Sequence, residues 1–365
     1  MSSQTSSASP GIAAWLQDKS GTPLYRAIFW VLFLVTAIVV FGMFRGFPQP
    51  ARATLLDMID GTAHRPFVTR ALVPSLVKRG GELVPDEFRK SLGDRVYAAP
   101  TWVHRTLFKR RAGSGRFDPW PPERVADIFI AFGIAFAFLV GYALVLRRFF
   151  VRVYEAPAWA GDAFCLIGLA AIPPFLGYSS YIYDFPTLFF TTLGLLLLFR
   201  RRWLAFAFLF PIACLNKETA IVLTLAFAVN YYSARSGMSR RGFAALLGYQ
   251  IVAFVAIRQL LLYRFRDNHG ALLEQHLQHN LMLPAYDLST LAALLLVIAL
   301  IFGHWSTKSR FLKRSLIIVL PLVGAASVFG WADELRGYYE VLPVALLLMA
   351  PTASAWLGGE IALRD

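Results

Sequence analysis

The sequence contains little charge and almost no cysteine, and both shortages restrict what the protein can be. Only 16% of the 365 residues are charged, whereas 57% are hydrophobic and the mean hydropathy is +0.54. A soluble chain of this size could not bury so much apolar surface, so lipid must form part of its solvent. The two cysteines, Cys165 and Cys214, lie in separate apolar segments. This spacing excludes a disulfide framework in the loops.

Several common signatures are missing as well. The chain has no phosphate-binding or dinucleotide-binding glycine motif and no nucleophile elbow of a serine hydrolase. It shows no internal repeat of the kind found in transporter halves, which weakens a transporter interpretation. The serine-rich start, residues 1–9, lacks the positive region of a signal peptide, so we expect the first apolar run to be retained as a helix.

Long apolar runs are what the sequence has instead. They predict an all-α, polytopic membrane protein with about ten transmembrane helices in one domain, residues 27–365, after a cytoplasmic segment of residues 1–26. The fifth and sixth runs are too short to cross a bilayer upright, because a crossing takes about 20 residues. The expected helices lie near residues 27–45, 125–146, 159–176, 185–199, 203–214, 219–233, 243–263, 289–304, 315–331 and 339–357.

Basic residues are concentrated in alternate loops. Arginine and lysine cluster after residues 146, 199, 233 and 304, whereas the short loops between these carry few. By the positive-inside rule, the basic loops and both termini face the cytoplasm. The first loop, residues 46–124, then lies outside, since loops longer than about 60 residues are exempt from the rule. This topology explains the net charge of +14 better than nucleic acid does, and no nucleic-acid partner is expected.

The long outer loop is predicted to carry short helices at the membrane surface. Residues 54–59 and 66–77 have helix-like apolar spacing, which Gly80 and Gly81 are expected to interrupt. Residues 84–122 mix glycine, proline and charge, and we expect a loosely ordered segment there. The basic faces of the short helices would contact the phosphates of membrane lipids.

Acidic and mixed-charge residues gather in the outer loops, and this is the main functional clue. Lys217 and Glu218 separate two half-length apolar helices, where unpaired charge is costly, so we expect them to pair with each other. Residues from five segments could converge on one outward-facing cleft. The candidates are Asp57, Asp60, His64, Arg65, Arg70, Tyr183, Asp184, Asn216, Lys217, Glu218, Arg258, Arg264, Glu334 and Arg336.

Several of these side chains also have a purely structural interpretation. Asp184 precedes Pro186 and is a good helix cap, and Asp60 before Gly61 is typical of a turn. Arg258 could extend to the membrane surface or pair with an internal acid. His276 and His279 have the spacing of metal ligands, but an amphipathic interfacial helix explains them better, and no metal site is predicted there.

Three features carry a resemblance to a known family: an acidic residue in the first outer loop, a break between two short helices with a lysine and a glutamate, and basic residues near the outer ends of later helices. They make the architecture of most of the chain similar to the GT-C superfamily of membrane glycosyltransferases. The segments RPFVTRALVP (65–74), YDFPT (183–187), NKET (216–219) and ELRGYYEVLP (334–343) also resemble uncharacterised bacterial membrane proteins placed near that superfamily. In this chain the acids of the first loop, Asp57 and Asp60, stand three residues apart, whereas the commonest family pattern has an adjacent pair.

The resemblance implies an inverting transferase whose donor is a polyprenyl-phosphate-linked sugar and whose acceptor is a glycan, a lipid or a protein. The first-loop acid would then act as general base or position the acceptor, and basic side chains would bind the lipid phosphate. Asp57 and Asp60 would share one helix face, where they could bind an acceptor hydroxyl or a divalent cation such as Mg²⁺ or Mn²⁺. A polysaccharide polymerase or ligase, and a non-enzymatic transporter or lipid-binding scaffold, remain as alternatives.

Overall fold

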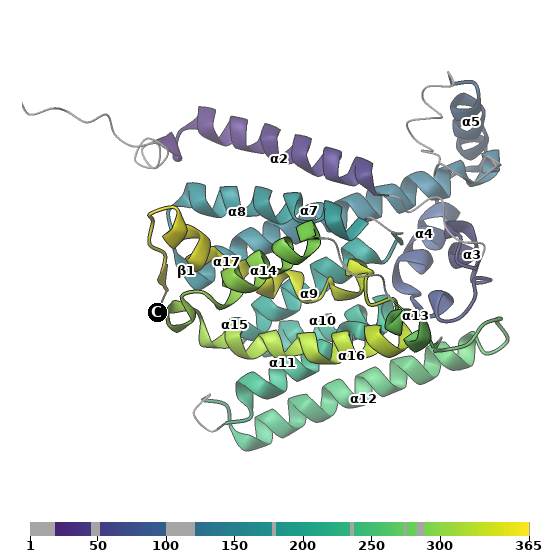
Figure 1. Ribbon diagram of the computed structural model, residues 1–365. Helices are drawn as coiled ribbons and strands as arrows, with labels where there is room; N and C mark the ends of the chain where they lie inside the picture. Colours follow the sequence, from purple (N-terminus) through teal and green to yellow (C-terminus); the bar gives the residue numbers. More distant parts are fainter. Residues whose placement is uncertain are drawn as a thin grey trace, which may run out of the picture.

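The computed structural model describes residues 19–44, 52–99, 121–176, 180–233, 237–273, 275–282 and 288–364. This part of the chain is all-α apart from one antiparallel pairing of two residues each, β1 (Tyr154–Glu155) with β2 (Ala362–Leu363). The long helices lie side by side in a bundle (Figure 1). One end of the bundle carries α3 to α5, and the opposite end carries β1 and β2; we call these the α3–α5 end and the β1–β2 end.

Five helical segments are long and apolar enough to cross a membrane, as expected for a multi-pass membrane protein. Two of them bury very little of their surface, with 17% of the apolar window buried in the first and 11% in the fourth. Exposed apolar side chains on these helices suit contact with lipid. The five segments are α2 (Pro23–Met43), η2 with α7 (Pro122–Arg124 and Val125–Val153), α8 with η3 (Ala158–Ala170 and Pro173–Leu176), α12 (Arg240–Arg264), and α15, η7 and α16 (Arg310–Ser315, Leu316–Ile318 and Val319–Phe329).

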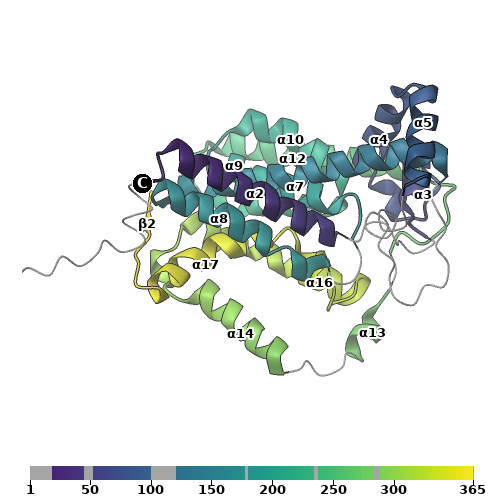
Figure 2. The same ribbon diagram turned by 90° about the horizontal axis from the view of Figure 1, so that it is seen from above.

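Five shorter apolar helices complete the set of ten apolar segments expected from the sequence. In Figure 2, α14 lies at the edge of the bundle beside α17, where the Thr352 hydroxyl donates to the Gly303 carbonyl at 2.8 Å. How many of the shorter helices cross the bilayer stays a prediction. They are α9 (Asp184–Phe199), α10 (Trp203–Asn216), η4 with α11 (Glu218–Ile221 and Val222–Tyr231), α14 (Leu288–Phe302) and α17 (Leu342–Trp356).

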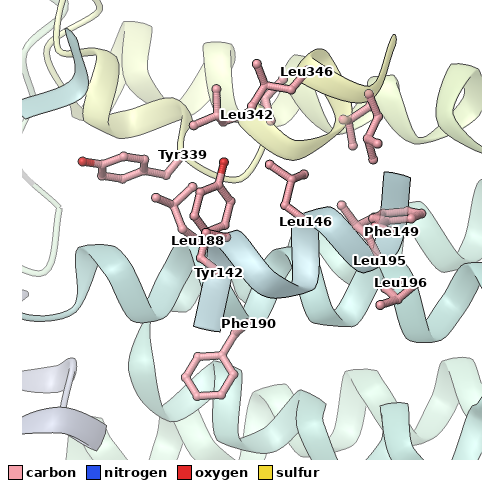
Figure 3. Packing of buried hydrophobic residues seen from close by; sticks show 14 of the residues in the cluster. Tyr142, Leu146, Phe149, Leu188, Phe190, Leu195, Leu196, Tyr339, Leu342 and Leu346 are labelled. Carbon is pink, nitrogen blue, oxygen red and sulfur yellow. The ribbon is translucent and has the colours of Figure 1, made fainter. Parts of the chain in front are cut away.

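The main core forms where α7, α9 and α17 meet (Figure 3). Tyr142 and Leu146 of α7 lie beside Leu188 of α9 and Leu342 of α17, and all four are buried. Close packing between helices depends on small residues here. A Cβ at Gly168 would lie 2.4 Å from the Leu146 Cδ2 atom, so this glycine lets α8 approach α7 closely.

The described part of the first long loop, residues 52–99, folds into three short helices, of which the prediction anticipated two. They are α3 (Leu55–Asp60), α4 (Leu72–Glu82) and α5 (Asp86–Tyr97), with the turn η1 (Phe67–Thr69) between the first two. The predicted break at Gly80 and Gly81 is wrong, since α4 continues through both residues. Gly81 is needed for packing, because a Cβ there would lie 2.3 Å from the Asp127 Oδ1 atom.

The loose segment expected over residues 84–122 is also wrong in its first part, because α5 occupies residues 86–97. Pro85 precedes the helix, and Asp86 and Glu87 stand in its first turn, where negative charge favours a helix start. Arg89 of α5 then pairs with the buried Asp127 of α7 at 3.2 Å. Residues 100–120 of that segment, and residues 1–18 of the predicted N-terminal segment, lie outside the described residues.

A second, smaller core joins these helices to the bundle. Met58 and Ile59 of α3 and Val73 and Val77 of α4 pack with the start of α7 and with Leu261 near the end of α12. The remaining connections are α13 (Leu277–Leu281), η6 (Trp305–Thr307) and η8 (Leu335–Tyr338). The α3–α5 end is therefore a packed cap on the helix bundle.

The basic loops gather at the opposite end. α7 ends after Arg152, α9 ends before Arg200, and α12 begins at Arg240, all at the β1–β2 end (Figure 1). Partial desolvation, together with the neighbouring charges of Arg152, Arg202 and Arg148, lowers the pKa of Arg200. This grouping agrees with the arrangement used for the topology prediction, whose inside and outside assignment stays a prediction.

Candidate functional site

Arg70 and Glu218 form the central ion pair of the α3–α5 end. The Arg70 Nη2 atom lies 2.7 Å from Glu218 Oε1, and Nε lies 3.3 Å from Oε2. Burial opposes ionisation of both groups, but their mutual attraction prevails. It raises the pKa of Arg70 and lowers the pKa of Glu218 to about 2. The pair stays charged at neutral pH and ties the first loop to the junction of α10 and η4.

Tyr183 completes the surroundings of Arg70. The Arg70 Nη1 atom donates to the Tyr183 hydroxyl, and the guanidinium lies 4.5 Å from the centre of the Tyr183 ring. The Tyr183 carbonyl accepts a hydrogen bond of 3.1 Å from the Asn216 side chain, which also donates to Thr187 at 3.0 Å. The start of α9 is therefore held by both the first loop and the end of α10.

Arg258 reaches the same pair from α12. Its Nη1 atom lies 3.9 Å from Glu218 Oε2 and donates to the Thr69 hydroxyl at 3.4 Å. Of the two interpretations left open for Arg258, pairing with an internal acid is the one that the geometry supports. Both contacts are long, so the guanidinium keeps donor capacity that Arg70 has already used.

The expected pair between Lys217 and Glu218 is wrong. The Lys217 Nζ atom lies 3.2 Å from Glu340 Oε1, and the Thr219 hydroxyl donates to the same carboxylate. Lys217 has an extended backbone, with φ −158° and ψ 140°, between α10 and η4. Successive side chains point to opposite sides of an extended backbone, so neighbouring Lys217 and Glu218 find separate partners.

Glu334 and Arg336 form the third ion pair, at 2.8 Å between Glu334 Oε1 and Arg336 Nη2. The Arg336 guanidinium lies 4.3 Å from the centre of the Tyr181 ring, which is stacked on Tyr183 at 5.2 Å. Burial opposes the charge of Arg336, but Asp184 and other acidic neighbours raise the pKa of its guanidinium. The two stacked rings connect this pair to the one at Arg70.

Asp184 lies beneath these pairs at the first turn of α9. Its Oδ2 atom accepts a hydrogen bond of 2.7 Å from the Tyr181 backbone amide, which precedes the helix. The expected capping by Asp184 is wrong, because Tyr183 occupies the N-cap position and no side chain caps α9. Its Oδ1 atom is buried and has no hydrogen-bond partner among the described residues, and the same holds for Glu340 Oε2 and the Tyr339 hydroxyl. We call the residues that meet here the charge cluster: Arg70, Tyr183, Asp184, Asn216, Lys217, Glu218, Arg258, Glu334, Arg336 and Glu340.

Asp57, one of the two predicted catalytic acids, is engaged locally. Thr54 caps α3, and its hydroxyl donates to the Asp57 carboxylate while accepting a hydrogen bond of 3.1 Å from the Asp57 amide. The Thr62 hydroxyl donates to the same carboxylate at 3.3 Å. Thr54 is therefore the N-cap of α3, and its hydroxyl holds the Asp57 carboxylate at the first turn of the helix.

Asp60, the other predicted acid, has a different environment. Arg124 donates two hydrogen bonds to it, at 2.8 and 2.9 Å, and also pairs with Asp127 at 2.7 Å. The Asp60 side chain nevertheless remains 43% exposed. Among the described residues, neither Asp60 nor Asp57 has a hydrogen bond or ion pair to the charge cluster.

Asp60 and Arg264 line the same pocket, which has a volume of about 190 Å³. It lies between α3, α4 and the C-terminal end of α12, and we call it the α3–α12 pocket. Asp57 does not line it. The full lining is Met58, Ile59, Asp60, Gly61, Val68, Ala71, Pro74, Ser75, Lys78, Arg264, Phe265 and Asn268.

His64 and Arg65 stand beside this pocket, where the first loop meets the loop after α12. The Arg65 amide donates to the His269 carbonyl at 2.8 Å, and the His64 and His269 rings lie 5.9 Å apart. Gly270 has a φ of +93°, and a Cβ there would lie 2.7 Å from the Arg65 carbonyl oxygen. The contact therefore requires glycine, and it positions the two loops.

His276 and His279 both contact Trp331. The indole of Trp331 donates to His276 Nδ1 at 3.1 Å, and its ring is stacked on that of His279 at 5.1 Å. Within the described ranges, no three His, Cys, Asp or Glu side chains are grouped as metal ligands would be. The two histidines have a packing role.

Sequence reasoning missed three residues of this region: Glu340, Lys78 and Arg124. Glu340 lies within the segment ELRGYYEVLP, but its side chain was not singled out although it is fully buried. Lys78 adjoins a segment that was expected to form a helix at the membrane surface, where a lysine is common and does not indicate a binding site. Arg124 was placed at the far end of a long loop, and no signal in the sequence connects it with Asp60.

Comparisons with known proteins give no further indication of the function. No protein-family model, no curated protein and no solved structure matches the chain.

Proposed function

We propose that this protein is a membrane glycosyltransferase that takes its sugar from a polyprenyl-phosphate donor. The reaction takes place at the α3–α5 end, which we assign to the outer face of a bacterial inner membrane. The observation that carries the proposal is the convergence of side chains from five separate segments on one end of the bundle. Paired charges stand there directly beside a pocket that contains a carboxylate and cations.

The donor needs a cation that can receive a phosphate. Arg70, Lys217 and Arg336 each have an acid within 3.2 Å, so their charges are largely neutralised within the fold. Arg258 is held only by contacts of 3.4 and 3.9 Å and is 19% exposed. It is the cation of the cluster best able to bind the donor phosphate and stabilise it as leaving group.

The acceptor needs a base, and Asp60 fits this role better than Asp57. The Asp57 carboxylate accepts hydrogen bonds from two threonine hydroxyls, whereas Asp60 is more exposed and lines a pocket. Although Arg124 binds both Asp60 oxygens, a carboxylate has about four lone-pair sites, so an acceptor hydroxyl can still donate to it.

The proposed step is a single displacement at the anomeric carbon. Asp60 takes the proton of the acceptor hydroxyl, whose oxygen forms the new glycosidic bond. The bond from the anomeric carbon to the phosphate oxygen breaks, and polyprenyl phosphate leaves with the electron pair. Because attack comes from the face opposite the phosphate, the configuration inverts.

A divalent cation does not fit Asp57 and Asp60 as they stand. Thr54 and Thr62 donate to one carboxylate, and the positive Arg124 guanidinium covers the other. A Mg²⁺ or Mn²⁺ ion would have to displace a like charge from Asp60. No step of the proposed reaction uses a metal.

The test is a transfer assay with the full-length protein in nanodiscs. A panel of polyprenyl-phosphate hexoses is supplied with membrane extract as acceptor, and release of polyprenyl phosphate is measured. We expect release by the wild type, a loss of at least about 100-fold in Asp60→Asn, and near-normal release by Arg266→Met. Arg266 is a suitable control because its side chain is 62% exposed and stands outside the cluster.

A lipid-binding scaffold is the second candidate, because the ion pairs of the charge cluster neutralise one another. A scaffold would bind polyprenyl phosphate without consuming any donor. Binding with no release from the whole panel would contradict the transferase and favour this alternative.

A further inference from the structure

We propose that the α3–α12 pocket is the acceptor subsite, and that the acceptor carries a phosphate or carboxylate on a unit about the size of one sugar ring. The naming of an acceptor rests on the transferase proposed above. The preference for an anion rests on the pocket itself.

The cations of this pocket differ from those of the charge cluster. Each cation of the cluster has an acid within 4 Å. Lys78 and Arg264 are exposed, and within the described residues neither forms an ion pair. The Arg264 guanidinium lies 5.5 Å from the centre of the ring of its neighbour Phe265. Their charge is therefore available to a ligand.

Asp60 cancels only part of this positive charge. Its two oxygens already accept hydrogen bonds from Arg124 at 2.8 and 2.9 Å. With Lys78, Arg264 and Asp60 in the lining, the pocket carries one excess positive charge before Arg124 is counted. An anionic group placed between Lys78 and Arg264 would gain two charge-assisted hydrogen bonds.

The rest of the lining suits a sugar. Ser75 and Asn268 supply polar side chains, and Met58, Val68 and Phe265 supply an apolar wall. The pocket has a volume of about 190 Å³ and is partly open to the surface. This space suits a single ring with one substituent.

The pocket also adjoins the charge cluster. Arg258 and Arg264 are six residues apart on α12, which is about 9 Å along a helix axis. On the other side, Val68 and Ala71 line the pocket, while Thr69 and Arg70 between them contact Arg258 and Glu218. A donor phosphate at Arg258 and an acceptor in the pocket would thus be separated only by the turn η1.

Binding of glucose 6-phosphate to the full-length protein tests this proposal without any transfer reaction. The protein is placed in phosphatidylcholine nanodiscs, and binding is measured by calorimetry with glucose as the uncharged probe. We expect glucose 6-phosphate to bind at least tenfold more tightly than glucose. Lys78→Met and Arg264→Met should each weaken its binding about tenfold or more.

Two neighbouring cations provide matched controls. Arg79 and Arg266 are exposed but do not line the pocket, so Arg79→Met and Arg266→Met should bind glucose 6-phosphate as the wild type does. Equal affinity for glucose, or equal weakening in all four variants, would overturn the proposal.

Nanodiscs that contain phosphatidylglycerol distinguish a lipid headgroup from a soluble acceptor. If anionic lipid abolishes glucose 6-phosphate binding, the acceptor assignment is wrong, because the pocket then holds a lipid phosphate. The outcome is also separable from the proposed transfer. Donor release with no binding of glucose 6-phosphate would contradict this subsite and leave the proposed transferase intact. Binding of glucose 6-phosphate with no donor release would contradict the transferase and leave the anion-binding pocket intact.

Discussion

Lys217 pairs with Glu340, 123 positions later in the chain, and its neighbour Glu218 pairs with Arg70, 148 positions earlier. Two adjacent residues therefore form ion pairs with two segments that are 270 positions apart in the sequence. The junction between α10 and η4 is the point where the first loop and the segment before α17 meet. The charges at this junction connect the segments of the α3–α5 end. Removing one of them should lower the stability of the fold as well as weaken the binding of any ligand.

Loss of the Lys217 charge should destabilise the protein strongly. Glu340 is fully buried and Lys217 is only 10% exposed, so Lys217→Met leaves an uncompensated buried carboxylate, at a cost of about 3–5 kcal/mol. The double variant Lys217→Met with Glu340→Gln should recover most of that loss. Thermal unfolding in detergent measures both, and additive effects of the two substitutions would contradict the pairing.

The Arg70 and Glu218 pair should make stability depend on pH in the acid range. The pKa of Glu218 falls from an ordinary 4.5 in the unfolded chain to about 2 in the fold. A depressed carboxyl pKa stabilises the folded state above pH 4.5, and this contribution is lost as the pH falls toward 2. Thermal unfolding of the wild type and Glu218→Gln between pH 7 and pH 3 tests this, and the loss below pH 4.5 should be smaller in the variant.

The two acids of α3 should respond differently to replacement by asparagine. Asp60→Asn removes the proposed base and should lower transfer by about 10² to 10⁴, with little change in stability because the ion pair is partly exposed. Asp57→Asn weakens the contact between Asp57 and the capping hydroxyl of Thr54 and should cost up to about 1 kcal/mol while transfer persists. A transfer assay and an unfolding measurement on each variant are needed. The reverse pattern would move the base to Asp57.

Cysteine labelling tests the side of the membrane on which the α3–α5 end lies. Cys165 and Cys214 are buried, so introduced cysteines give the signal. Lys90→Cys on α5 should react with an impermeant maleimide in intact cells, and Arg241→Cys at the β1–β2 end should react only after permeabilisation. Both positions are exposed. Labelling in the opposite order would invert the topology and place the proposed reaction in the cytoplasm.

The sequence was sufficient for the helices because their signal is local. Apolar runs of 12 to 22 residues predict where helices form, and the ten expected segments agree with the apolar helices to within a few residues at most ends. The helix α5 was missed because its residues are mostly polar, and its stability comes from contacts such as Arg89 with Asp127. Local composition does not contain that information.

The candidate site was predicted as a set of residues and not as a set of pairs. The sequence by itself determined that Arg70, Lys217, Glu218 and Arg336 belong to the segments between apolar helices, because charge inside such helices is costly. Only the tertiary structure decided that Glu340 neutralises Lys217 and that Asp60 shares a pocket with Lys78 and Arg264. Ion pairing depends on atoms within about 4 Å, and residues more than 100 positions apart reach that distance only after the helices have packed.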